Sequence, residues 1–95
     1  MSVVVRRIVV SGRVQGVGFR YALADEARSR GIRGWVRNRR DGSVEAMLAG
    51  DADAVDALVA WARRGPQSAR VSSVEIEPVQ DSSGNFDDFD IVATV

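Results

Sequence analysis

The chain has 95 residues, of which 45% are hydrophobic and 27% charged, and its formal net charge is zero. This size and composition are typical of a soluble globular protein, so we expect a single domain over residues 1–95 and no membrane-spanning segment. Cysteine, histidine and lysine are absent. Their absence excludes disulfides, thiolate or lysine nucleophiles, cysteine-ligated zinc and the usual histidine base. Any reaction must therefore use arginine, carboxylates, amides, hydroxyls and the backbone.

The first 30 residues predict a strand followed by a helix. Residues 3–12 are rich in Val and Ile, and the apolar run at 8–10 indicates a strand covered on much of both faces. A helix is expected over residues 20–30, because its apolar residues share one face and Glu26 precedes Arg30 by four positions. Gly31 is well placed to end this helix.

The middle of the chain predicts a β-hairpin. Residues 32–39 alternate, with Gly34, Val36 and Asn38 on one face of the expected strand. Asp41-Gly42 is a strong turn signal, and residues 43–49 alternate back as a second strand.

The second half predicts a helix and two further strands. A helix is expected between the acidic residues at 51–56 and the Gly65-Pro66 stop. Residues 69–79 alternate as expected of a strand with one solvent-exposed face. Val74 and Ile76 lie on one face of this strand, and the acidic side chains lie on the other. A polar loop is expected over residues 81–88. The residues of the final strand that are expected to face the core are Phe89, Ile91, Ala93 and Val95.

The predicted order is β-α-β-β-α-β with one more strand at the C-terminal end. Two right-handed strand-helix-strand units joined by a hairpin give the split β-α-β, or ferredoxin-like, arrangement. We therefore expect an α+β fold with two helices on one face of a mostly antiparallel sheet. Many unrelated functions use this arrangement, so the fold does not identify the activity.

The charges are distributed unevenly along the chain. Residues 1–40 contain ten arginines and two acidic residues, whereas residues 41–95 contain three arginines and eleven acidic residues. This asymmetry is compatible with an anionic ligand at the basic half. The simpler interpretation, which we favour, is that the two halves interleave and the charges mix on the surface. Arg37, Arg39 and Arg40 are interpreted as a solvated cluster.

Residues 15–20 form a candidate anion site. A glycine-containing turn there leaves a strand and enters a helix, so several backbone N–H groups can converge at the positive end of that helix. An ordinary connecting loop is the alternative. Arg20 lies in the first helical turn, where a cation opposes the helix dipole at a cost of roughly 0.3–1 kcal/mol. A bound anion would offset this cost, although a solvated arginine is also possible.

Asn38 is a second candidate, because asparagine is depleted in strands and this one shares the Val36 face. If its strand ends beside the start of the first helix, the amide points toward residues 16–20. The alternative is that Asn38 only begins the turn toward Asp41-Gly42.

Four segments resemble the acylphosphatase family: GRVQGVGFR at 12–20, GWVRNRRDGSVE at 34–45, GPQSARV at 65–71 and FDDFDI at 86–91. The resemblance implies a ferredoxin-like hydrolase of the carboxyl–phosphate bond of acyl phosphates. It makes Arg20 the phosphate-binding catalytic residue and Asn38 the residue that orients the attacking water. The implied phosphate-binding set is Gln15, Gly16, Val17, Gly18, Phe19 and Arg20.

The residue types fit this chemistry. An acyl phosphate expels a carboxylate, whose conjugate acid has a pKa of about 4 by analogy with Asp and Glu. Such a leaving group needs no proton donor, unlike the alkoxide of a stable phosphate ester. We therefore expect activity without metal or cofactor, with inorganic phosphate or sulfate as competing ligands. A cytoplasmic monomer that binds neither nucleic acid nor membranes is also expected.

Three alternatives remain open from the sequence. The first is a non-catalytic anion- or small-molecule-binding module of the same fold. The second is an RNA-binding domain, which would need aromatic residues on the open sheet face, where the first strand offers only Arg7, Val9 and Ser11. The third is an acylphosphatase-like domain of a carbamoyl-transfer protein.

Overall fold

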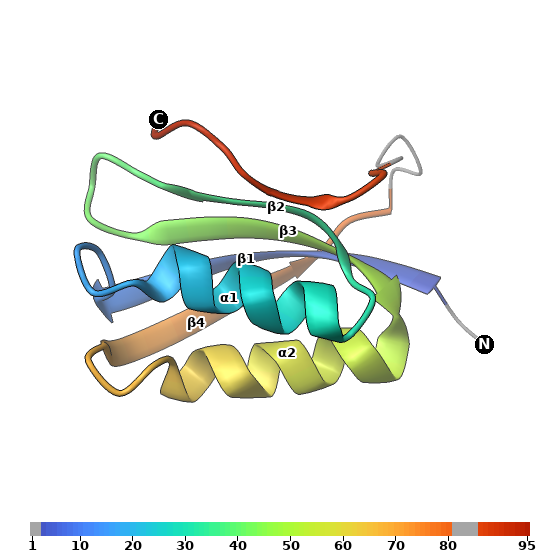
Figure 1. Ribbon diagram of the computed structural model, residues 1–95, viewed down its shortest axis with the longest axis horizontal. Coiled ribbons are helices and arrows are strands. Elements are labelled where there is room, and N and C mark those ends of the chain that lie inside the picture. The colour runs from blue at the N-terminus through green and yellow to red at the C-terminus, as the bar shows by residue number, and fades with distance from the viewer. Residues whose placement is uncertain (1–2, 81–85) are drawn as a thin grey trace.

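The computed structural model describes residues 3–80 and 86–95 and has the predicted order of elements. These are β1 (Val3–Arg13), α1 (Phe19–Ser29), β2 (Arg33–Asn38), β3 (Val44–Asp51), α2 (Ala52–Arg64), β4 (Arg70–Pro78) and β5 (Phe89–Ile91). Both helices cover the same face of one sheet (Figure 1). The strand order is β4-β1-β3-β2-β5, with β5 parallel to β2 and the other pairs antiparallel. The α+β ferredoxin-like prediction is confirmed, with β5 added at the β2 edge.

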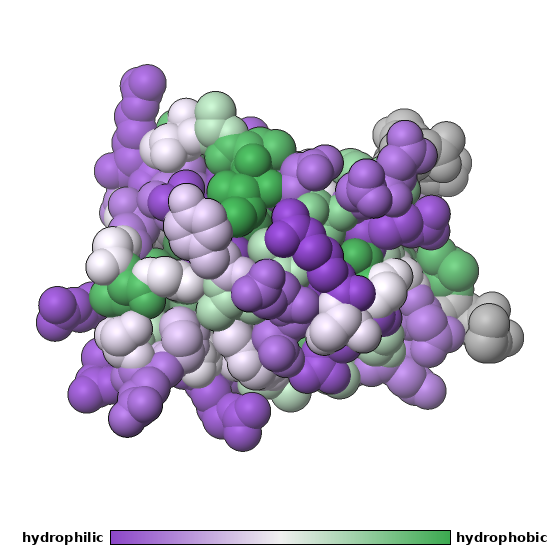
Figure 2. Space-filling model, viewed as in Figure 1, coloured by the Kyte–Doolittle hydropathy of each residue, from purple (hydrophilic) through white to green (hydrophobic). Residues whose placement is uncertain are grey.

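The hydrophobic core lies between the sheet and the helices. The predicted apolar faces are buried, including Leu23 and Ala27 of α1 and Val36 of β2. The surface of the helical side is mainly hydrophilic, with apolar areas limited to separate patches (Figure 2). Phe19 opens α1, is only 1% exposed, and has its ring centroid 5.8 Å from that of Trp61. This packing fixes where α1 begins and therefore where the loop before it ends.

Three positions that were predicted or implied to face inward lie at the surface. Ile76 is 43% exposed, because β4 is an edge strand. Ala93 is exposed and Val95 is 51% exposed, because β5 already ends at Ile91. Val95 nevertheless stays beside the β2 end of the sheet, where its N–H donates to the carbonyl of Asn38 at 3.2 Å. Residues 81–85 of the expected polar loop lie outside the described residues.

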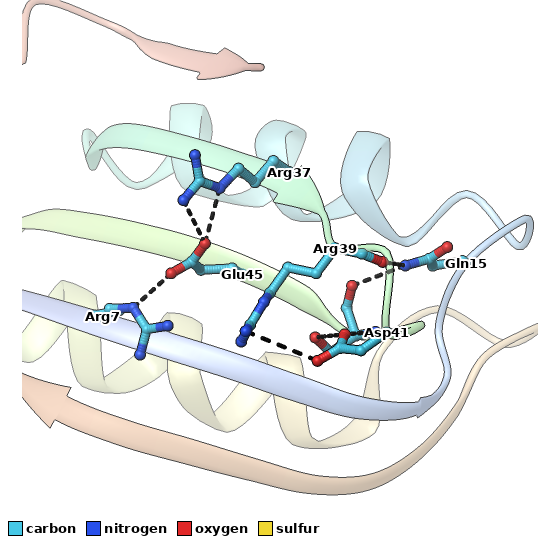
Figure 3. A network of polar contacts seen from close by, with 7 residues as sticks. Arg7, Gln15, Arg37, Arg39, Asp41 and Glu45 are labelled. Atoms are coloured by element: carbon cyan, nitrogen blue, oxygen red, sulfur yellow. Dashed lines mark hydrogen bonds and ion pairs between the residues drawn. The ribbon is translucent and has the colours of Figure 1, made fainter. Parts of the chain in front are cut away.

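The open face of the sheet carries a buried carboxylate between two arginines. Glu45 of β3 is 5% exposed and accepts hydrogen bonds from Arg7 of β1 and Arg37 of β2 (Figure 3). The Arg37 guanidinium also lies 4.5 Å from the Trp35 ring centroid. Arg37 is therefore bound rather than solvated, which corrects the prediction of a solvated cluster. Because Glu45 comes from the acidic half, these pairs confirm that the two halves interleave.

Glu45 should make stability depend on pH. Burial raises the pKa of Glu45, but hydrogen bonds from Arg37 and Arg7 outweigh it and hold the pKa below its ordinary value of 4.5. The contribution of Glu45 to the stability of the folded protein is therefore present at pH values above the ordinary pKa. It is lost as the pH falls through the lowered pKa of the folded state. Glu45→Gln should destabilise the protein at pH 7 by on the order of 2 kcal/mol and flatten the acid side of the stability profile. Urea unfolding at several pH values checks this, with exposed Glu75→Gln as the control. Profiles of the same shape for the wild type and Glu45→Gln would contradict it.

Candidate active site

The connections β1–α1, β2–β3 and α2–β4 lie at one end of the molecule (Figure 1). We call residues 14–18, between β1 and α1, the glycine loop. Two neighbours hold this loop. The Gln15 side chain reaches the β2–β3 turn, and the Ser68 hydroxyl of the α2–β4 connection donates to the carbonyl of Val17 at 2.8 Å. The fold therefore brings Gln15 of the glycine loop next to the strand end that carries Asn38, which is the condition on which the interpretation of Asn38 depends.

The backbone of the glycine loop has the geometry of an anion-binding nest. Gly16 and Gly18 have φ of 73° and 79°, whereas no described residue other than glycine has a positive φ. The sign of φ thus alternates along 16–18, and such alternation is typical of nests, in which successive N–H groups point toward one side. A Cβ at either glycine would meet no atom within 4 Å. These positions therefore require glycine for its backbone conformation rather than for space.

The start of α1 is rich in free donors. Gly18 is the N-cap residue, no side chain caps the helix, and its first turn contains no acidic residue. Among the described residues, no acceptor is hydrogen-bonded to the backbone N–H groups of residues 15–21. The positive end of the helix is therefore uncompensated within this part of the chain, which favours an anion there.

Arg20 adds a full positive charge to this end. It is the second residue of α1, partly buried, with its guanidinium carbon 5.7 Å from the centroid of the Tyr21 ring. Within residues 3–80 and 86–95, no carboxylate forms an ion pair with it. An arginine that opposes the helix dipole and has no acidic partner is well suited to bind an anion.

Asn38 ends β2 on the side of the sheet that the helices cover. It lies opposite Val44 of β3, two residues after the fully buried Val36. Its Oδ1 is buried, and no group of the described residues donates a hydrogen bond to it. Such an atom is uncommon and costs about 1–3 kcal/mol, so it requires an explanation.

The turn after Asn38 does not supply that explanation. Asp41 closes the turn by accepting hydrogen bonds from the Ser43 N–H at 2.9 Å and from the Ser43 hydroxyl at 2.6 Å. These hydrogen bonds lower the pKa of Asp41. The Asn38 side chain takes no part in them, which argues against a role limited to turn formation. The Oδ1 atom is instead a buried acceptor that receives no hydrogen bond from the described residues.

Gln15 has a role that the sequence did not indicate. Its Nε2 donates to the carbonyls of Arg39 at 2.7 Å and Ser43 at 2.9 Å (Figure 3). The sequence predicts only the backbone N–H of this residue as part of the anion site. No local pattern could reveal the side-chain contact, because it depends on how the hairpin packs against the loop.

None of the helices in the described part of the chain is long and apolar enough to span a bilayer.

Comparison with known proteins identifies the family of this chain. The model of the acylphosphatase family matches residues 6–91. An acylphosphatase of Nitrobacter hamburgensis is 63% identical over 79 residues, which cover 83% of this chain and 80% of that protein. An acylphosphatase of Anaeromyxobacter dehalogenans is 56% identical over 85 residues, or 90% of each chain. The crystal structure of acylphosphatase from Bacillus subtilis has a TM-score of 0.89 at 37% identity and covers 96% of this chain and 99% of that one. The chain belongs to the acylphosphatase family, a family of hydrolases.

Proposed function

We propose that the chain hydrolyses the carboxyl–phosphate bond of acyl phosphates, which yields a carboxylate and inorganic phosphate. One observation carries this proposal. Within the described residues, the amides at the start of α1 donate to no acceptor, Arg20 has no carboxylate partner, and Oδ1 of Asn38 at the neighbouring strand end has no donor. The first two features suit a phosphoryl group, and the third suits a water molecule next to it. The names of the relatives support the substrate class.

In this proposal, Arg20 and the backbone N–H groups of residues 15–20 bind the phosphoryl oxygens. The planar guanidinium can donate to two oxygens at once, while the amides take the remaining charge. Donors that are already oriented need no rearrangement as charge develops, which is the largest usual source of catalysis in such sites.

Asn38 orients the nucleophile in the same proposal. Its Oδ1 accepts a hydrogen bond from water, whose lone pair then points at phosphorus. The water oxygen bonds to phosphorus as the bond to the acyl oxygen breaks, and the carboxylate departs with the electron pair. Both protons of the water remain with the product phosphate: one stays on the oxygen that attacked, and the other passes to a phosphoryl oxygen, which gives dihydrogen phosphate. No covalent enzyme intermediate, metal or cofactor is required.

Hydrolysis of two substrates by the purified chain tests this proposal. With a chelator present, we expect turnover of benzoyl phosphate and little turnover of phenyl phosphate, whose leaving group resembles tyrosine with a pKa of about 10. A non-catalytic binding module would hydrolyse neither. Loss of benzoyl phosphate turnover on chelation would contradict the metal-free mechanism.

Inorganic phosphate and sulfate should be competitive inhibitors. Both resemble the group that residues 15–20 are proposed to hold, so they should raise KM and leave kcat unchanged. Initial rates measured against both anions, with sodium chloride at matched ionic strength as the control, check this. Unchanged KM at concentrations on the order of tens of millimolar would count against the phosphate site.

The proposal treats residues 1–95 as one acylphosphatase-like domain that acts as a cytoplasmic monomer. Size-exclusion chromatography and fractionation of cells test the last two points. The carbamoyl-transfer alternative receives no support from the two relatives described above, both of which are named for acyl phosphate hydrolysis.

A further inference from the structure

The Gln15 side chain bridges two parts of the site that are far apart in the sequence. Residue 15 belongs to the glycine loop, and its Nε2 donates to the carbonyls of Arg39 and Ser43, 24 and 28 positions away. Both neighbours are hydrogen-bond acceptors, so the nitrogen of the carboxamide must face them. In Figure 3, the Gln15 nitrogen points into the β2–β3 turn and the oxygen points away from it.

The two carbonyls belong to the residues that close this turn. The Arg39 N–H donates to the Ser43 carbonyl at 2.8 Å, and the Arg39 carbonyl accepts from the Gly42 N–H at 3.1 Å. Gln15 therefore binds the base of the turn rather than its exposed tip. Arg39 directly follows Asn38, so this contact is made one residue away from the proposed water-orienting group.

The glycine loop has no other hydrogen bond to this hairpin among the described residues. Its two glycines have positive φ, and its backbone N–H groups donate to nothing in the described chain. The Ser68 hydroxyl holds Val17 from the other side of the loop. Hence, within the described residues, the two hydrogen bonds of Gln15 are those that join the loop directly to the hairpin that carries Asn38.

We propose that Gln15 is a positioning residue, which holds the phosphate-binding amides at the correct distance and direction from Asn38. This inference rests on the proposed function. In-line attack requires phosphorus and water to be aligned, and a displacement of about 1 Å can lower the rate about 100-fold. Arg20 and the loop amides belong to one continuous segment, so they can still bind phosphate when the segment shifts relative to Asn38.

Gln15→Met tests this role, because methionine has a similar length and no donor. We expect kcat for benzoyl phosphate to fall by about 10- to 100-fold, while the inhibition constant of inorganic phosphate changes by less than about threefold. Gln80→Met, at an exposed position outside the elements of the site, is the matched control. A structural role alone would lower the melting temperature and leave kcat of the folded variant near that of the wild type, and that result would overturn the proposal.

A double-mutant cycle with Asn38→Ala makes the test specific. If Gln15 acts by aligning the loop with Asn38, Gln15→Met should lower kcat by less than about threefold when Asn38 is already absent. If Gln15→Met lowered kcat by the same factor in the wild-type and in the Asn38→Ala backgrounds, the positioning role would be overturned. The proposed function would still stand in that case, provided that the wild type hydrolyses benzoyl phosphate. If Gln15→Met does not fold, Gln15→Glu replaces it in the cycle, because its carboxylate has the shape of glutamine but cannot donate at neutral pH.

Discussion

Arg20→Ala is expected to lower kcat/KM for benzoyl phosphate by roughly a factor of 10³. Removing one oriented neutral donor from a transition-state site costs about 10²–10³ in rate, and Arg20 is charged and can donate twice. Arg20 has no acidic partner among the described residues, so its loss leaves no carboxylate there without a counterion. It also opposes the helix dipole, so the variant should be as stable as the wild type or slightly more stable.

Steady-state kinetics with the phosphate inhibition constant and melting temperature check this expectation. Arg63→Ala, at an exposed position in the last turn of α2, is the matched control and should leave kcat/KM unchanged. Arg20→Lys should recover part of the activity, because an ammonium keeps the charge but cannot reproduce the planar fork. If Arg20→Ala retained more than about a tenth of wild-type kcat/KM, the role given to Arg20 would be wrong.

Asn38→Ala should lower kcat by about 10²–10³ and leave the affinity for inorganic phosphate nearly unchanged. In the proposed mechanism, Arg20 and the amides contact a charge that is present before and during the reaction, so they should affect both binding and rate. In the same mechanism, Asn38 contacts only the water, so its contribution should appear in the chemical step. The substitution also removes a buried oxygen that lacks a donor among the described residues. No large loss of stability is therefore expected.

The same variant separates catalysis from turn formation. A turn-forming Asn38 would lower the melting temperature on replacement and leave kcat of the folded protein near normal. Asp41→Ala is the informative comparison, because Asp41 does close the turn. We expect Asp41→Ala to affect stability more than Asn38→Ala does, and kcat less. The reverse order for kcat would remove the water-orienting role from Asn38.

Local patterns predicted most of the fold because each element has a clear period and a clear end. The buried faces of α1 and α2 follow the helical repeat, and Asp41-Gly42 joins two alternating strands. The pattern was misleading at residues 93 and 95. The alternation of apolar residues there predicts burial. Whether such a residue is buried, however, depends on which other element of the fold packs against it. Beyond Ile91, the chain only follows the edge of β2 through backbone hydrogen bonds.

The candidate site was predictable where a residue conflicts with its local setting. Arg20 at a helix start and Asn38 in a strand are both unfavourable locally, and the two glycines of the loop have the positive φ that a nest requires. The link from Gln15 to the hairpin and the burial of Glu45 between Arg7 and Arg37 were not predictable. Both depend on residues brought together by the strand order, and no short-range pattern records that order.

Hydrolysis of benzoyl phosphate in ¹⁸O-labelled water identifies the atom that water attacks and therefore tests the roles proposed for Arg20 and Asn38. If Asn38 directs water at a phosphorus atom held by Arg20 and the loop amides, the label should enter inorganic phosphate and leave the benzoate unlabelled. Mass spectrometry of both products after a single round of hydrolysis locates the label. A control without the protein measures how much label exchanges into the products by itself. Label in the benzoate carboxyl group would mean attack at the carbonyl carbon and would contradict the roles given to both residues.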